Sequence, residues 1–210
     1  MLHKNPKLIA PETFALIQEL QAIPKLENYY LVGGTALTLQ IGHRNSIDID
    51  LFTTDQFEAE SILKLLSKKF KTIATLSRKS TLLAQVNGIK VDFISHPYKI
   101  IKPIIKEENI SMLSMEDICA MKLNAITNSG QRLKDFIDVY YLLEHFSIAQ
   151  MLEFYHEKYP HMNEIIPLRA ITFFDDIDPQ IDPPKLLITL PIKKIEARII
   201  DAVKHSNKRF

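Results

Sequence analysis

The 210-residue chain has little of what marks several common protein classes. Its single cysteine, Cys119, cannot form an internal disulfide, so we expect a protein of a reducing cytoplasm. No apolar run approaches the length of a membrane span, and the first 14 residues contain no apolar signal segment. Twenty-six Lys and Arg balance 25 Asp and Glu, so net charge does not indicate a protein that coats nucleic acid.

Glycine is also scarce, and two of the five glycines stand side by side at positions 33 and 34. They follow the apolar run YYLV (29–32), which is typical of a short buried strand, and precede TALTLQIG, which has the composition of a helix ending at Gly42. The pattern predicts a strand, a glycine turn and a helix. Such a turn lets backbone amides approach a phosphate, with Thr35 able to donate its hydroxyl.

The next segment, IDIDLFT (47–53), alternates apolar and acidic residues. Alternation predicts a strand with Ile47, Ile49 and Leu51 towards a core, so Asp48 and Asp50 share the opposite face. Asp92, between Val91 and Phe93 in another strand-like run, is expected on the same side of the sheet. Three carboxylates on neighbouring strands suit two-metal phosphoryl transfer with Mg²⁺.

Each of these features alone has an ordinary explanation. A Gly-Gly pair is most often a turn, and Asp-x-Asp or a lone strand aspartate is usually a solvated acid of an edge strand. Arg44, after the expected helix end, could stabilise the helix dipole or bind phosphate oxygens with its guanidinium. The order of the features on consecutive elements favours a nucleotide site.

The remaining chain divides by pattern. Asp55 is a candidate N-cap for a helix through residue 70, and Asn87-Gly88 predicts a hairpin because both residues tolerate positive φ. Beyond residue 96 we expect helices only, capped by Ser114 and Ser147 or opened by Pro191, with a loop at 175–185. The predicted fold class is α+β, with a mixed sheet and helices in residues 1–100 and a helical domain in 101–210.

The stretch GGTALTLQIGHRNSIDIDLF (33–52), followed by a single strand aspartate, resembles the nucleotidyltransferases of the DNA polymerase β type. The residues of this stretch resemble the AbiEii/AbiGii toxin family in particular. The helical motif of that family resembles a second stretch of the chain, MKLNAITNSGQRLKDFIDVYYLLE (121–144). The resemblance implies a Mg²⁺-dependent transfer of a nucleotide from an NTP. It also implies a role in toxin–antitoxin or abortive-infection systems, with an antitoxin or winged-helix regulator as partner.

The resemblance assigns roles to individual residues. The metal ligands and catalytic acids would be Asp48, Asp50 and Asp92, joined from the helical half by Lys122 and Asp135. Nucleotide contacts would come from Gly33, Gly34, Thr35, Arg44, Ser46, Lys122 and Arg132. The alternative for Lys122, Arg132 and Asp135 is a surface set of ion pairs, and Asp138 is expected to orient its helix or lie on the surface.

The identity of the acceptor stays open at this level. An RNA such as tRNA, or a protein, would suit a toxin, whereas a small molecule would suit an enzyme of antibiotic modification or ordinary metabolism. A binding module that holds nucleotide without catalysis is a further alternative. Three clustered carboxylates argue against that alternative, because clustering like charges costs free energy that binding alone does not require.

Overall fold

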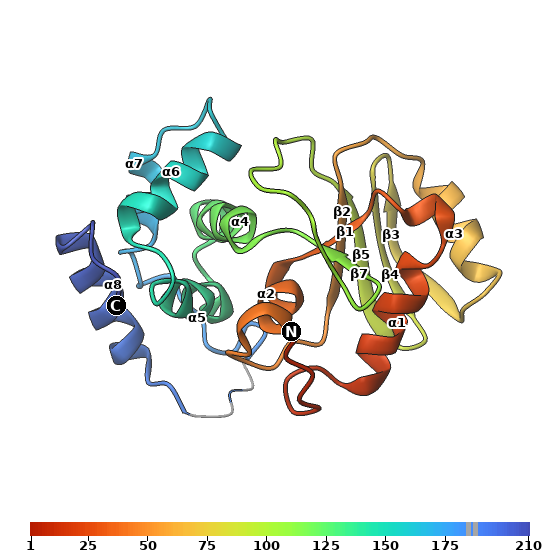
Figure 1. Cartoon of the computed structure of the whole chain (residues 1–210), viewed down its shortest axis with the longest axis horizontal. Helices are drawn as coiled ribbons and strands as arrows, with labels where there is room; N and C mark the ends of the chain where they lie inside the picture. Colours follow the sequence, from red (N-terminus) through yellow and green to blue (C-terminus); the bar gives the residue numbers. More distant parts are fainter. Residues whose placement is uncertain (184–185, 187–188) are drawn as a thin grey trace. The chain divides into compact units, whose positions relative to one another are not determined.

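The computed structural model describes residues 1–183, 186 and 189–210 (Figure 1). The chain forms two compact units, one made of residues 1–99 and 103–113, the other of residues 100–102 and 114–210. The sequence pattern predicts a division at residue 100, which would put residues 103–113 in the helical half. They belong to the first unit instead, because they add two strands to its sheet.

Within residues 1–113, all of which the structure describes, seven strands form one sheet in the order β3-β4-β5-β2-β1-β7-β6. The parallel pairs are β2 with β5 and β1 with β7, and the other neighbours are antiparallel. The mixed sheet of the predicted α+β class is therefore confirmed. The strands are β1 (Tyr30–Val32), β2 (Ile49–Thr53), β3 (Thr72–Arg78), β4 (Thr81–Val86), β5 (Ile89–Ser95), β6 (Ile105–Glu107) and β7 (Ile110–Met112).

Two hairpins show what the sequence signals could and could not indicate. Asn87 and Gly88 have φ of +52° and +84° and join β4 to β5, which confirms the Asn-Gly prediction. The turn between β6 and β7 uses Glu108 and Asn109, also at positive φ. The expectation of helices only beyond residue 96 is wrong here, because these two strands have three residues each and lack a glycine at the turn.

Four helical segments accompany the sheet: α1 (Pro11–Gln21), the 3₁₀ turn η1 (Pro24–Leu26), α2 (Gly33–Ile41) and α3 (Ala59–Ser67). Helix α1 begins at its proline as predicted, because a first-turn residue needs no amide donor. Helix α3 begins later than expected. Asp55 is not its N-cap, since Glu58 holds that position and the Asp55 amide donates to the Thr53 hydroxyl instead.

The second unit contains α4 (Met115–Asn128), α5 (Leu133–Leu142), α6 (Ile148–Lys158), α7 (Ile165–Ala170) and α8 (Ile192–Lys204). Ser114 and Ser147 cap α4 and α6 through their hydroxyls, and Pro191 precedes α8, as predicted. Residues 175–183 form no helix or strand, and positions 184–185 of the expected loop lie outside the described residues.

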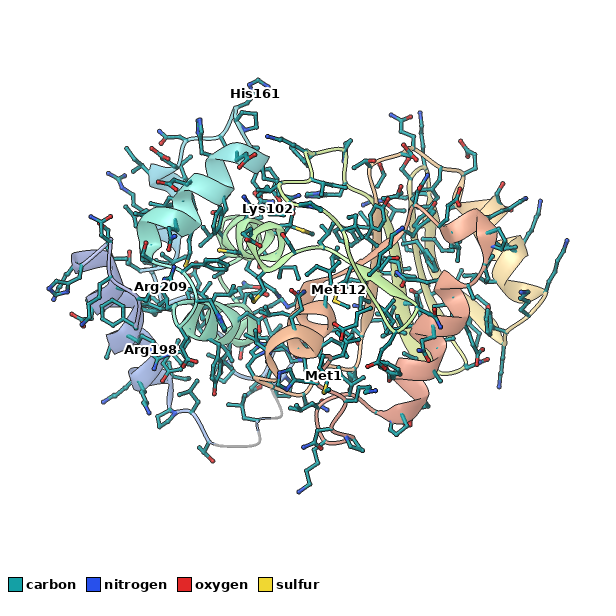
Figure 2. The ribbon with its side chains drawn as sticks, viewed as in Figure 1. Met1, Lys102, Met112, His161, Arg198 and Arg209 are labelled. Carbon is teal, nitrogen blue, oxygen red and sulfur yellow. The ribbon has the colours of Figure 1, made fainter. Side chains whose placement is uncertain are left out.

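Two cations tie the helices of this unit together. The ammonium of Lys158 lies 2.7 Å from the fully buried carboxylate of Asp117, which also accepts from the amides of residues 101 and 102. Arg198 of α8, labelled in Figure 2, stacks 3.7 Å from the ring centre of Tyr140 and donates to the Tyr140 carbonyl. No helix among the described residues is both long and apolar enough to span a bilayer.

Candidate active site

Strand register brings two of the predicted acids together. Asp50 of β2 is the register partner of Asp92 of β5, so both side chains leave the same face of the sheet on adjacent strands. The flanking apolar side chains, Ile49, Leu51, Val91 and Phe93, are fully buried on the opposite face. Because β2 and β5 are both interior strands, the alternative of acids that protect a sheet edge is wrong for this pair.

The third acid, Asp48, lies one residue before β2. The strand was expected to start at residue 47, but it starts at Ile49, and the Ile47 side chain is 50% exposed instead of facing the core. Asp48 still lies two residues before Asp50. Its carbonyl accepts a hydrogen bond from the buried Thr35 hydroxyl, which anchors the backbone before β2 to helix α2.

Hydrogen bonds of polar side chains between residues 35 and 46 hold this backbone in place. The Thr35 hydroxyl lies 2.9 Å from that of Ser46, and the Thr38 hydroxyl donates to the Arg44 carbonyl at 3.0 Å. Arg44 is 2% exposed and donates from Nη1 to the Asn45 carbonyl at 3.0 Å. These contacts hold the segment between α2 and β2 in place, whereas the nucleotide contacts expected for Thr35, Arg44 and Ser46 stay predictions.

Both positions require glycine because other side chains approach their backbone closely. No separate turn intervenes, since α2 begins at Gly33 directly after β1, and Gly33 has a φ of +68°. A Cβ at Gly33 would collide with a carboxylate oxygen of Asp50, and a Cβ at Gly34 would collide with the Arg44 guanidinium. The glycine pair therefore lets the N-terminus of α2, with its partial positive charge, approach the Asp50 carboxylate.

Lys90 is a member of the site that the sequence analysis missed. Its ammonium lies 3.1 Å from Asp92 Oδ2 and 4.0 Å from Asp48 Oδ2. Burial alone would lower the pKa of Lys90, but the charges of Asp92, Asp48 and Asp50 outweigh it and raise the pKa. Its position two residues before Asp92 in the same strand was the available signal, because i and i+2 share a face.

The oxygen donors of this cluster fit a hard divalent cation. The Lys90 ammonium between Asp48 and Asp92 shows that these two acids attract positive charge to one place. No three His, Cys, Asp or Glu side chains of the described residues converge as a ready metal site. The Lys90 side chain is 53% exposed and can withdraw from the carboxylates, and Mg²⁺ binding by Asp48, Asp50 and Asp92 stays a prediction.

Replacing Lys90 by methionine is expected to tighten metal binding. At about 4 Å, a lost like charge corresponds to roughly 1 kcal/mol in water, or about fivefold in affinity. Isothermal titration with Mn²⁺ measures the change, and the metal-free variant should melt at a lower temperature than the unsubstituted protein. Lys79→Met, an exposed lysine of the same unit, is the control, and equal Mn²⁺ affinity in all three proteins would contradict the assigned role of Lys90.

The predicted residues of the helical unit form a cluster of their own. Lys122 of α4 lies 2.7 Å from both Asp135 and Asp138 of α5, and all three are buried. A surface ion-pair set is therefore wrong for Lys122 and Asp135, and Asp138 is fully buried instead of lying on the surface. Arg132 precedes α5 and reaches Asp135 only at 4.0 Å, because it also pairs with Asp182 at 3.2 Å.

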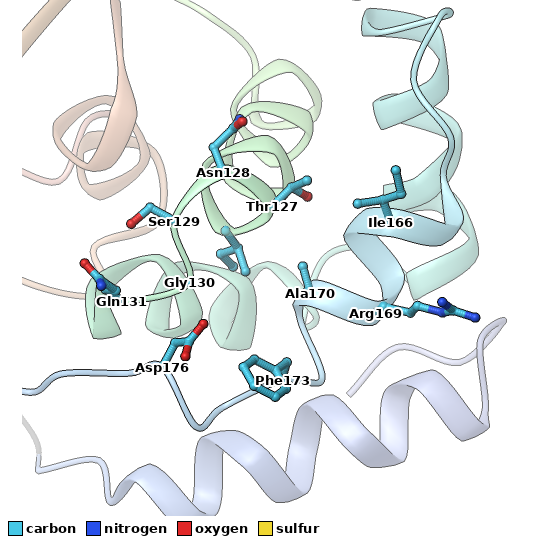
Figure 3. Close-up of a pocket in the computed structure, with 11 residues that line it drawn as sticks. Thr127, Asn128, Ser129, Gly130, Gln131, Ile166, Arg169, Ala170, Phe173 and Asp176 are labelled. Atoms are coloured by element: carbon cyan, nitrogen blue, oxygen red, sulfur yellow. The ribbon is translucent and has the colours of Figure 1, made fainter.

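A pocket of about 570 Å³ opens elsewhere in the helical unit (Figure 3). Its walls come from the end of α4, helix α7 and the segment around Phe173 and Asp176. None of the predicted site residues lines it. Within the helical unit, the pocket is therefore distinct from the Lys122 cluster.

The sheet with its acids and glycine-started helix defines a class of protein, the nucleotidyltransferases, and solved structures share the fold. MenT4, the nucleotidyltransferase toxin Rv2826c from Mycobacterium tuberculosis H37Rv, matches with a TM-score of 0.58 and 15% identity over 92% of this chain and 82% of its own. JHP933 from Helicobacter pylori matches with a TM-score of 0.55 and 14% identity, covering 93% and 89%.

The family follows from the sequence itself. Residues 15–208 match the family described as nucleotidyl transferase AbiEii toxin of type IV toxin–antitoxin systems, and the chain belongs to that family. The resemblance drawn from residues 33–52 is thus confirmed, and the protein is a nucleotidyltransferase of a toxin family. The uncharacterized protein aq_aa25 from Aquifex aeolicus (strain VF5) is 27% identical over 166 residues, which cover 76% of this chain and 80% of that protein.

Proposed function

We propose that this enzyme transfers a nucleotide from an NTP to a hydroxyl of an RNA, such as tRNA, or of a protein, and that the transfer makes it the toxin of a toxin–antitoxin or abortive-infection system. The family supports nucleotidyl transfer and a toxin role. The observation that carries the proposal is the register of Asp50 with Asp92 beside the N-terminus of α2. A regulator of winged-helix type would serve as antitoxin, in the cytoplasm, where NTPs and RNA are abundant.

Asp48, Asp50 and Asp92 would hold the Mg²⁺ ions. When bound, Mg²⁺ lowers the pKa of an attacking hydroxyl and neutralises charge on the phosphates. A carboxylate oxygen of Asp92 accepts the proton of the acceptor hydroxyl. The main-chain amides at Gly33 and Gly34 bind phosphate oxygens in this proposal, because they stand at the N-terminus of α2, where the helix supplies partial positive charge.

Arg44, Ser46 and Thr35 act in this proposal mainly by holding residues 42–48 against α2 and so fixing Asp48. Lys122, Asp135 and Arg132 are proposed from the family resemblance to contribute to nucleotide use. Lys122 already has two carboxylate partners within its own unit. Kinetics at a temperature where variants stay folded would show whether a triphosphate competes with these partners for Lys122.

Incubation with Mg²⁺, each α-³²P-labelled NTP and total cellular RNA tests the proposal directly. Label is expected to enter an RNA or protein band with one NTP, and chelation of Mg²⁺ by EDTA should abolish it. The labelled band identifies the acceptor class and the NTP identifies the base. Transfer to small molecules alone would support the metabolic alternative, and NTP binding without any transfer would support the non-catalytic binding module.

A further inference from the structure

One segment of the first unit has an extreme charge pattern. Residues 61–91 contain seven Lys and Arg and no Asp or Glu, so the remaining chain carries 19 basic against 25 acidic residues. All seven side chains are exposed. They are Lys64 of α3, Lys68, Lys69, Lys71, Arg78, Lys79 and Lys90.

Six of these cations have no carboxylate partner among the described residues. Lys90 pairs with the acid cluster, whereas no ion pair joins the other six to an acid in the part of the chain that the structure describes. Several cations of the helical unit behave differently, since Lys122, Lys134, Lys158 and Arg198 each contact an aspartate or a glutamate. We name the six residues Lys64, Lys68, Lys69, Lys71, Arg78 and Lys79 the basic strip.

The basic strip follows the edge of the sheet. Strand β3 is an edge strand, six of its seven residues are exposed, and the basic residues lie on the helix before it and at its two ends. Seven strand residues extend roughly 20 Å, the length of several nucleotides of a single strand. Protection of the edge against aggregation would explain cations beside β3 but not those of α3 or the complete lack of acids.

Register connects this edge to the acids. Leu76 of β3 pairs with Leu83 of β4, Leu83 pairs with Asp92 of β5, and Asp92 pairs with Asp50 of β2. These side chains share one face of the sheet, and three strand spacings separate Leu76 from Asp50, about 14 Å. Ile73 and Leu76 are 56% and 38% exposed, so they can contact bases or sugars.

We propose that the basic strip binds the phosphate backbone of a nucleic-acid strand and directs its reactive hydroxyl across the sheet face to Asp48, Asp50 and Asp92. The inference rests on the proposed function and selects RNA as the acceptor class. Exposed cations on α3 and at both ends of an edge strand that is connected by register to the acids suit a flexible polyanion. An anionic bilayer is a poorer fit, because a flat membrane held at the sheet edge would not reach the acids, which lie up to three strands away on the sheet face.

The test measures RNA binding by the full chain without NTP. The probe is a fluorescein-labelled, mixed-sequence, single-stranded 20-nucleotide RNA, followed by anisotropy between 50 and 300 mM KCl. The strip variant carries Lys64, Lys68, Lys69, Arg78 and Lys79 changed to Gln. The control variant removes the same charge elsewhere by changing Lys25, Lys193, Lys194, Lys204 and Arg209 to Gln, and circular dichroism verifies that both are folded.

The strip variant should bind RNA at least about tenfold more weakly at 100 mM KCl, and its salt dependence should be shallower by about 0.7 for each phosphate that the variant no longer neutralises. The control variant should stay within about twofold. With labelled NTP, the strip variant should show a raised KM for RNA and an unchanged kcat at saturating RNA. This combination is expected when acceptor binding weakens and the chemical step stays the same.

Three results would overturn the inference: equal RNA affinity in the strip variant and the unsubstituted protein, equal losses of affinity in both variants, or binding to vesicles containing 30% phosphatidylserine without binding to RNA. Label transferred only to protein would also overturn it, while leaving nucleotidyl transfer intact. If RNA binding depends on the basic strip but no NTP supports transfer, the result would count against the proposed function. The basic strip would still be an RNA-binding surface.

Discussion

Asp50→Asn is expected to abolish nucleotidyl transfer while the protein stays folded. Asp50 stands opposite Asp92 in parallel strands, two residues after Asp48, so the substitution removes one of three clustered carboxylates. If a bound metal supplies roughly 4 kcal/mol of transition-state stabilisation, its loss lowers the rate by about 10³-fold. Transfer of label from the preferred NTP measures this rate, and titration with Mn²⁺ should show weaker binding.

The stability of Asp50→Asn is not expected to fall with its activity. Like charges on directly opposed strand residues destabilise a sheet, so removing one should leave the melting temperature unchanged or raise it slightly. Asp55→Asn, an exposed acid outside the cluster, is the matched control and should retain both activity and stability. Full transfer activity in Asp50→Asn would reject the metal site, and a large fall in melting temperature would show that Asp50 supports the fold instead.

Lys122→Met is expected to destabilise the protein more than any single change to the sheet acids. The substitution leaves the carboxylates of Asp135 and Asp138 buried beside each other without the cation that lies 2.7 Å from both. Breaking a buried ion pair in this way costs about 3–5 kcal/mol. For a chain of this size that cost corresponds to a fall of roughly 10 °C in melting temperature, which calorimetry measures.

A combined variant separates the charge effect from the change in packing. Lys122→Met with Asp135→Asn and Asp138→Asn removes the buried charges together and should recover much of the melting temperature, because neutral amides cost less to bury than carboxylates. Unchanged stability of Lys122→Met alone would contradict the buried cluster. The kinetics of NTP use by Lys122→Met are measured well below its melting transition. A loss of NTP use would support the predicted nucleotide role of Lys122 as well, whereas unchanged kinetics would show that Lys122 is a structural residue.

Sequence signals were reliable where a residue acts on the backbone of its near neighbours in the chain. Asn87-Gly88, Pro11 and the capping serines 114 and 147 act through backbone geometry within a few residues, and the structure confirms each. The same reasoning failed for β6 and β7. Three-residue strands are too short for a periodic pattern, and β7 is held by its parallel pairing with β1, which lies far earlier in the chain.

By itself, the sequence determined the class of enzyme and its candidate acids. A glycine pair, an alternating acidic strand and a later strand aspartate are ordered features of the chain, and side-chain alternation puts each acid on a defined face. Tertiary structure alone decided what surrounds them. It placed Lys90 between Asp48 and Asp92, pressed Asp50 against Gly33, and buried Asp138 with Lys122. Register and burial are set by packing between distant segments, which no local pattern encodes.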